Sequence, residues 1–243
     1  MAALRESLNL FARQFALALH QSTRVRLGSS WAAPEAADDD ALRASEAHLP
    51  GTGWIVGLAA CLAFAVVALA LRGNSWGAAA AAVASLVVTL LMTGAGHESA
   101  LFRTAERLEA DGPSGLGTIV LVLALLAKVI LLAALASVSE AGVIAALFAA
   151  HVLSRLAPLL VAHRLDGRHE PRTLRIAVLW CLPALLLTSL AGGWPFLFLG
   201  LLAAGLACYG MLRLAANQPH ADLPAASQQA CELAFYLGAA IGA

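Results

Sequence analysis

The sequence places a histidine and a carboxylate at the end of a long apolar stretch. Small and apolar residues run from Ala78 to Met92, and a short Thr-Gly-Ala-Gly segment then leads into His97-Glu98. Three more acidic residues follow, at Glu106, Glu109 and Asp111. If the stretch crosses a membrane, these groups lie at its water-facing end, where acidic side chains are costly unless they face water or a cation. We therefore place the candidate site at this junction.

The spacing of the acidic residues is compatible with a metal site. Glu98 and Glu106 are eight residues apart, so in a helix they lie within about 80° of each other, and Glu109 follows one turn later. Oxygen ligands of this kind suit Mg²⁺, which commonly shares them with substrate phosphates. A solvated loop whose acidic and basic residues pair with each other is an equally open interpretation. A zinc protease motif is excluded, because Leu101 occupies the position of its second histidine.

Two cations lie where a membrane span tolerates them least. Lys128 is in the middle of Leu121–Leu132, and Arg155 is in the middle of the fourth apolar stretch. A central charge costs about 2.5–3.5 kcal/mol on insertion scales, so such residues usually face a bundle interior or an anionic ligand. We expect Lys128 to pair with a carboxylate or to contact a phosphate that enters from the cytoplasmic side.

The composition is typical of a polytopic membrane protein. Of 243 residues, 60% are hydrophobic and 12% are charged, whereas soluble domains average about 45–50% and about 25%. The net charge is zero, which gives no electrostatic argument for a nucleic-acid partner. Stretches of about 20 apolar residues predict an all-α transmembrane bundle of six to seven spans. The predicted spans are Trp54–Leu71, Trp76–Ala95, Gly117–Val138, Ala141–Ala162, Leu174–Leu190 and Pro195–Ala215, with a shorter last stretch at Gln229–Ala243.

The residues before the first span differ from the rest. In Leu4–Leu27 apolar side chains recur at helical spacing, which predicts an amphipathic helix at the membrane interface. Residues Gly28–Gly53 are expected to form a polar surface linker. Within it, Asp38-Asp39-Asp40 predicts a solvated helix start, with metal binding as the alternative. We therefore divide the chain into residues 1–53, the N-terminal helix and linker, and residues 54–243, the transmembrane domain.

Arginines orient the predicted bundle. They gather before the first span and after the second, fourth and sixth, whereas Arg72 lies in a loop on the other side. The positive-inside rule then places the N-terminus and the loop His97–Leu116 in the cytoplasm. We therefore predict a multi-pass protein of the cell inner membrane.

Five segments carry motifs that occur together in one family. They are residues 18–25 (ALHQSTRV), 49–57 (LPGTGWIVG), 93–107 (TGAGHESALFRTAER), 114–117 (SGLG) and 222–233 (DLPAASQQACEL). In this order they resemble the cobalamin synthases, or adenosylcobinamide-GDP ribazoletransferases. The third segment is similar in part to the family's core motif T-G-x-x-H-[EL]-D-G-L-A-D-x-x-D-G, and Lys128 falls where the family carries a lysine.

The resemblance implies a membrane-bound transferase of vitamin B12 biosynthesis. Such an enzyme joins adenosylcobinamide-GDP to α-ribazole, or to its 5′-phosphate, with release of GMP and with Mg²⁺ as cofactor. The lipid bilayer is a further partner, together with a homo-oligomer or a complex with other cobalamin-pathway proteins. The implied site residues are His97, Glu98, Lys128 and Asp222 for catalysis, Arg24, Thr104, Ser114, Arg155 and Glu232 for substrate binding, and Glu98, Glu106 and Asp222 for the metal.

The acidic motif departs from the family pattern. Ser99, Arg103 and Glu106 stand where the family has aspartates, and Arg103 would place a positive charge at the position of a metal ligand. A catalytically degenerate relative, which binds a corrinoid or supports a complex, is therefore a second hypothesis. A small transporter is a third, but it would require internal repeats and more polar residues near the bilayer midplane than this sequence has.

Overall fold

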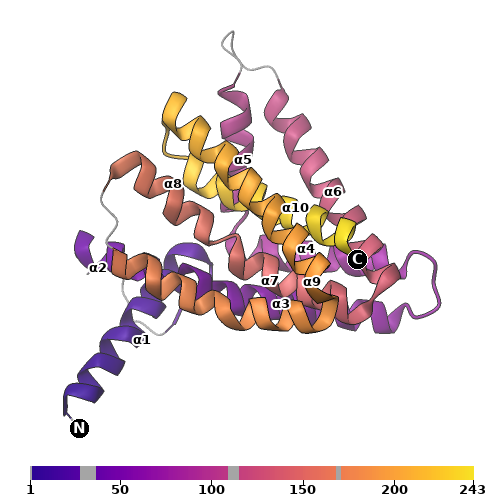
Figure 1. Cartoon of the computed structure of the whole chain (residues 1–243), viewed down its shortest axis with the longest axis horizontal. Coiled ribbons are helices and arrows are strands. Elements are labelled where there is room, and N and C mark those ends of the chain that lie inside the picture. Colours follow the sequence, from indigo (N-terminus) through magenta and orange to yellow (C-terminus); the bar gives the residue numbers. More distant parts are fainter. Residues whose placement is uncertain (1, 28–36, 109–114, 168–170) are drawn as a thin grey trace.

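The computed structural model describes residues 2–27, 37–108, 115–167 and 171–243 (Figure 1). These residues form helices and contain no strand, as the composition predicts. The elements are α1 (Ala2–Ser22), α2 (Asp39–Ser45), the 3₁₀ helix η2 (Glu46–His48), α3 (Leu49–Ala70), α4 (Gly77–Thr93), α5 (Gly96–Glu106), α6 (Leu116–Val138), α7 (Glu140–Leu153), α8 (Leu156–Asp166), α9 (Pro171–Asn217) and α10 (Leu223–Gly242).

Four of the described helical segments are long and apolar enough to cross a membrane. A fifth is added if α4 and α5, which meet at 90°, form one broken span. This count is lower than the six to seven predicted, because the predicted spans Leu174–Leu190 and Pro195–Ala215 both lie in α9 and because α10 is not among the candidates. The outward faces of α3, α6 and α9 carry exposed leucines, as lipid contact requires.

Helix α7 lies at the centre of the bundle, and nearly all of its side chains are buried. Helices α3, α6, α9 and α10 pack around it. Glycines bring α3 close: a Cβ at Gly53 would lie 2.4 Å from the carbonyl oxygen of His151, and a Cβ at Gly57 would touch Phe148. Small residues at such contacts allow the close helix packing that is usual in membranes.

Helix α9 contains a sharp reversal. Gly193 has φ 77° and ψ −178°, which is not helical, and Figure 1 shows the two halves of α9 doubling back on each other. Glycine adopts this conformation readily, whereas residues with a Cβ do not. The end of α10 is seated beside the reversal, since a Cβ at Gly242 would lie 2.6 Å from the carbonyl oxygen of Pro195.

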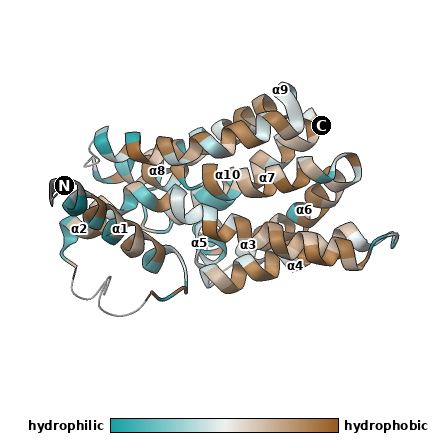
Figure 2. Cartoon of the chain, turned by 90° about the horizontal axis from the view of Figure 1, so that it is seen from below, coloured by the Kyte–Doolittle hydropathy of each residue, from teal (hydrophilic) through white to brown (hydrophobic). Residues whose placement is uncertain are grey.

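The predicted N-terminal helix is present but ends at Ser22, before the predicted Leu27, and its second half packs on the bundle. Leu17 and Leu19 are buried, while the rings of Phe11 and Phe15 lie 5.9 and 5.5 Å from that of Trp180. Its first half projects from the bundle (Figure 1). Figure 2 shows hydrophilic residues gathered at this end of the molecule, where α1 and α2 lie.

The linker prediction is correct at its acidic triplet and wrong near its end. Asp38 caps α2 by accepting a hydrogen bond of 2.8 Å from the backbone N–H of Ala41. Helix α3 begins at Leu49, five residues earlier than predicted, and its first turn is buried. Pro50 at the start explains this, because proline is well suited to the first turn of a helix.

Replacing Gly193 by alanine tests the reversal. We expect Gly193→Ala to destabilise the protein by about 1–3 kcal/mol, because alanine must adopt a conformation that is essentially restricted to glycine. Gly205→Ala is the matched control, since Gly205 lies in the same helix and a Cβ there meets nothing within 4 Å. Thermal unfolding in detergent measures both variants. Equal unfolding midpoints for Gly193→Ala and Gly205→Ala would contradict the requirement for glycine at the reversal.

Candidate functional site

A buried ion pair joins α6 to α10. The ammonium group of Lys128 donates hydrogen bonds to Glu232 Oε1 at 2.8 Å and to Gln229 Oε1 at 2.5 Å. The side chains of Lys128 and Glu232 are each 2% exposed. This confirms the predicted interior position of Lys128 and its pairing with a carboxylate. Removing two charges from water is costly, and good geometry with further hydrogen bonds is needed to offset that cost.

Glu98 is connected to this pair through one amide. Gln229 Nε2 donates to Glu98 Oε1 at 2.5 Å, while the Oε1 atom of the same amide accepts from Lys128. Glu98 is buried, and its Oε2 atom has no hydrogen-bond partner among the described residues. One carboxylate oxygen of α5 is therefore available for a ligand.

Arg155 completes the charged cluster at the break between α7 and α8. It is 1% exposed, its Nη1 donates to the carbonyl oxygen of His151 at 2.5 Å, and it interacts electrostatically with Glu232 and Glu98. Its Nε and Nη2 atoms are buried without a partner in the part of the chain that the structure describes. A buried donor left unsatisfied is costly, and a guanidinium is well suited to bind a phosphate. The cluster therefore has the chemistry of an anion site.

A cavity of about 240 Å³ adjoins the cluster, and we call it the His97 cavity. His97 lines it, and so does Gln228, which precedes Gln229 of the cluster on α10. His97 interacts electrostatically with Arg155 and with Lys128. Its Nδ1 atom is buried and has no hydrogen-bond partner among the described residues. His97 therefore belongs to both the cavity and the cluster.

Arg24 lies at the bend between α4 and α5, just before His97. Its backbone N–H donates to the carbonyl oxygen of Met92 at 2.6 Å. A Cβ at Gly94 would lie 2.6 Å from Arg24 Nε, so the guanidinium is in contact with this glycine. Gly94 has φ 69°, and the absence of a side chain there leaves room for the arginine.

The predicted metal ligands are held apart by different partners. Glu106 Oε1 accepts a hydrogen bond of 2.6 Å from the backbone N–H of Gly117, at the start of α6. Asp222 Oδ1 lies 2.7 Å from Arg103 Nη2, and Arg107 is also close at 3.5 Å. Within residues 2–27, 37–108, 115–167 and 171–243, no three His, Cys, Asp or Glu side chains form a group that could hold a metal ion.

The described residues fit a different mode of magnesium binding. Mg²⁺ is often bound through one or two protein carboxylates together with substrate phosphates and water. The free Oε2 atom of Glu98 suits that mode, whereas Glu106 and Asp222 are engaged elsewhere. Thr104 lies on α5 with its hydroxyl buried and without a partner among the described residues. The predicted residues Glu109, Asp111 and Ser114 lie outside the described part of the chain.

Sequence reasoning missed three members of the cluster: Gln229, His151 and Tyr236. His151 Nδ1 lies 3.8 Å from Glu232 Oε2, and the Tyr236 hydroxyl donates to Glu232 Oε1 at 3.3 Å. A signal was present, because Gln229, Glu232 and Tyr236 are spaced by three and four residues and so share one face of a helix. His151 likewise precedes Arg155 by four residues.

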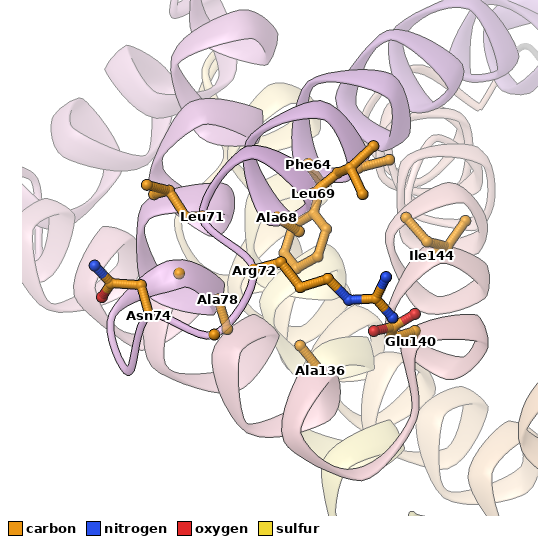
Figure 3. A pocket seen from close by; sticks show the side chains of 13 residues that line it. Phe64, Ala68, Leu69, Leu71, Arg72, Asn74, Ala78, Ala136, Glu140 and Ile144 are labelled. Carbon is orange, nitrogen blue, oxygen red and sulfur yellow. The ribbon is translucent and has the colours of Figure 1, made fainter.

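A larger cavity of about 410 Å³ is lined by the end of α3, the start of α4, the end of α6 and the start of α7. Figure 3 shows the side chains of Arg72 and Glu140 pointing toward each other there, among apolar residues that include Phe64 and Ala78. We call it the Arg72 cavity. It contains none of the buried cluster residues, and it provides positions for control substitutions.

Comparisons with known proteins agree with the motifs. The family model described as cobalamin-5-phosphate synthase matches residues 14–240. The adenosylcobinamide-GDP ribazoletransferase of Polaromonas naphthalenivorans (strain CJ2) is 34% identical over 273 aligned positions, which cover 95% of this chain and 98% of that protein. The proteins of the same name from Albidiferax ferrireducens and Ralstonia nicotianae are 34% and 31% identical, over 96% and 85% of this chain and 99% and 81% of their own. No solved structure gives a significant match.

Removing one member of the buried ion pair should destabilise the protein more than neutralising both members. We expect Lys128→Met to destabilise the protein by about 3–5 kcal/mol, because it leaves the Glu232 carboxylate buried and uncompensated. The double variant Lys128→Met with Glu232→Gln should recover at least about half of that loss, since no unpaired charge remains. Thermal unfolding in detergent compares the variants. A double variant less stable than the single one would contradict this account.

The ion pair of Asp222 predicts a pH dependence at the surface. The hydrogen bond from Arg103 and the charges of both arginines lower the pKa of the Asp222 carboxyl below its ordinary value. Its contribution to stability is therefore complete above the ordinary pKa of about 3.9 and is lost as the pH falls through the lower folded value.

We expect wild type to exceed Asp222→Asn in stability by about 0.2–1 kcal/mol between pH 5 and 7, since the paired Arg103 is half-exposed. The difference should shrink below about pH 4. Unfolding midpoints across this range provide the measurement, and a difference that grows on acidification would disprove the role of the pair.

Proposed function

This chain belongs to the cobalamin-5-phosphate synthase family, and we propose that it is an adenosylcobinamide-GDP ribazoletransferase. Its reaction joins adenosylcobinamide-GDP to α-ribazole, or to its 5′-phosphate, giving adenosylcobalamin, or its phosphate, and GMP. The observation that carries the proposal is the buried cluster. In it, Arg155 has two donor atoms without a partner among the described residues, which could bind an anion, and Glu98 has one such carboxylate oxygen. None of the comparisons favours a degenerate relative.

The reaction replaces a phosphoanhydride bond of the diphosphate by a new phosphoester bond. A ribose hydroxyl of the acceptor attacks the phosphorus that is bonded to the cobinamide, a new P–O bond forms, and the bridging P–O bond to GMP breaks. GMP leaves, and the hydroxyl loses its proton. Enzymes catalyse such phosphoryl transfers mainly by positioning and charge stabilisation. In our proposal, Arg155 and Lys128 hold oxygens of the diphosphate, and Glu232 and Gln229 keep the ammonium group of Lys128 in place.

His97 and Glu98 have the remaining roles in this proposal. The free Nδ1 atom of His97 accepts the proton of the attacking hydroxyl, because His97 lies between the cluster and the cavity. Glu98, together with the substrate phosphates, would hold Mg²⁺, which supplies charge neutralisation on the diphosphate when it is bound. Arg24 stands at the adjacent bend, where it can approach the phosphates from the aqueous side.

Asp222 and Glu106 are structural rather than catalytic in this scheme. Asp222 holds Arg103 and Arg107 near the end of α5, and Glu106 fixes the start of α6. The arginine distribution supports an orientation in the inner membrane with the N-terminus in the cytoplasm, where nucleotide substrates are available.

The assay follows GMP release from adenosylcobinamide-GDP and α-ribazole by the full chain in lipid. We expect Glu98→Gln to lower the rate about 10²–10³-fold, as loss of one electrostatic group in an active site commonly does, and chelation of Mg²⁺ to stop turnover. Glu140→Gln is the matched control, because Glu140 is the same residue type in the Arg72 cavity and its replacement should leave the rate unchanged. Equal rates for the two variants would refute the role of Glu98, and absence of GMP release by the folded wild type would refute the function.

A further inference from the structure

We propose that the Arg72 cavity binds a phospholipid whose headgroup carries a phosphate and a primary ammonium group, as phosphatidylethanolamine does. Arg72 takes the phosphate, Glu140 takes the ammonium group, and an acyl chain follows the apolar surface of the bundle. This inference goes beyond the proposed function and does not rest on it. Four features of the cavity support it: its place in the bundle, its charges, its apolar side and the turn that carries Arg72.

The cavity lies where two predicted membrane spans end. It is lined by the turn between α3 and α4 and by the junction of α6 and α7, and both α3 and α6 belong to candidate spans. Trp76, in the same turn, is 76% exposed. Tryptophans are enriched at the membrane–water interface, at the level of the lipid headgroups. The mouth of the cavity is therefore at the depth where a headgroup lies.

One positive and one negative side chain meet in the cavity. Figure 3 shows Arg72 and Glu140 pointing toward each other, from the α3–α4 turn and from the first residue of α7. Both residues are exposed, and an exposed ion pair contributes little to stability, so a ligand that satisfies both charges can replace it. A guanidinium binds phosphate oxygens well, and a carboxylate accepts hydrogen bonds from an ammonium group. The pair therefore complements a zwitterionic headgroup, whereas an anionic headgroup leaves Glu140 without a cation.

The apolar side of the cavity continues into the outer surface of the bundle. Phe64, Leu69 and Ile144 are among its lining residues, and Leu69 is also 69% exposed. Val66 and Leu62 precede Leu69 by three and seven residues, so they share its face of α3, and they are 56% and 66% exposed. An acyl chain can follow this face away from the cavity. The volume of about 410 Å³ falls in the range of about 300–1,000 Å³ that small-molecule sites occupy.

The turn that carries Arg72 is held by short-range hydrogen bonds. The backbone N–H of Asn74 donates to the carbonyl oxygen of Leu71, and the backbone N–H of Gly77 donates to that of Asn74, each at 2.9 Å. Asn74 Oδ1 also accepts from the backbone N–H of Trp76 at 2.8 Å. An ordered turn loses little further conformational freedom when a ligand binds, so Arg72 is presented to the headgroup from a fixed backbone.

Lipid binding to the purified full chain tests the proposal. The protein in detergent is titrated with phosphatidylethanolamine, phosphatidylcholine and phosphatidylglycerol of identical acyl chains, and native mass spectrometry measures the dissociation constants. We expect wild type to bind phosphatidylethanolamine about three- to tenfold more tightly than either of the other lipids. The quaternary ammonium of choline has no N–H to donate to Glu140, and the glycerol headgroup has no cation.

Two substitutions separate the two charges. Arg72→Gln should weaken the binding of all three lipids, because each has the phosphate. Glu140→Gln should weaken phosphatidylethanolamine about three- to tenfold and should strengthen phosphatidylglycerol, because the repulsion between two negative groups is removed. Changes of opposite sign cannot arise from poor folding alone. Arg213→Gln is the matched control, since Arg213 is an exposed arginine outside this cavity that contacts Tyr209, and it should bind all three lipids as wild type does.

Three results would overturn the proposal. The first is a wild type that binds phosphatidylethanolamine no more tightly than either of the other lipids. The second is a Glu140→Gln variant that keeps the wild-type ratio of affinities for phosphatidylethanolamine and phosphatidylglycerol. The third is an Arg213→Gln variant that loses as much affinity as Arg72→Gln, which would show that any surface arginine supplies the attraction.

The outcome is independent of the transferase assay. The described residues that line the Arg72 cavity include none that line the His97 cavity and none of the buried cluster. The lipid therefore takes no part in the transfer, and replacing Glu140 changes the lipid preference and not the rate of GMP release. Absence of GMP release by wild type would leave the lipid site standing, and equal lipid affinities would leave the activity standing.

Discussion

The ammonium group of Lys128 is buried in a bundle whose outer surface is apolar, and the surrounding helices must balance its charge. Glu232 supplies the balancing carboxylate and Gln229 supplies a second acceptor. Both come from α10, so α10 must lie inside the bundle with its polar face toward α6. The proposed phosphate chemistry depends on this arrangement, because the same groups that satisfy Lys128 also hold Glu98 and face Arg155.

Two breaks in helical structure make room for this cluster. The chain breaks between α7 and α8 at Arg155, which puts a guanidinium in the interior. The 90° bend between α4 and α5 turns His97 and Glu98 inward rather than onward along the span. Irregular backbone at membrane depth is tolerated where it is buried in protein or lines a cavity, and both breaks lie beside the cluster.

The fold class could be predicted from the sequence because apolar length and helical spacing depend only on local residues. The same holds for the interior positions of Lys128 and Arg155, since a central charge has few alternatives in a bilayer. The grouping of acidic ligands could not be predicted, because residues that share a helix face can still have different tertiary partners. Glu106 bonds to the start of α6, and Asp222 meets arginines that are distant in sequence.

Gln229 connects the buried ion pair to Glu98, which a pair of charges alone would not do. Its amide accepts from Lys128 at one end and donates to Glu98 at the other, so one planar amide connects the two residues. In the proposed scheme, an anion that draws Lys128 away from Gln229 would also disturb the hydrogen bond that holds Glu98, and a cation bound at Glu98 would change the affinity for that anion by the same factor. The two proposed binding positions would therefore be coupled through Gln229.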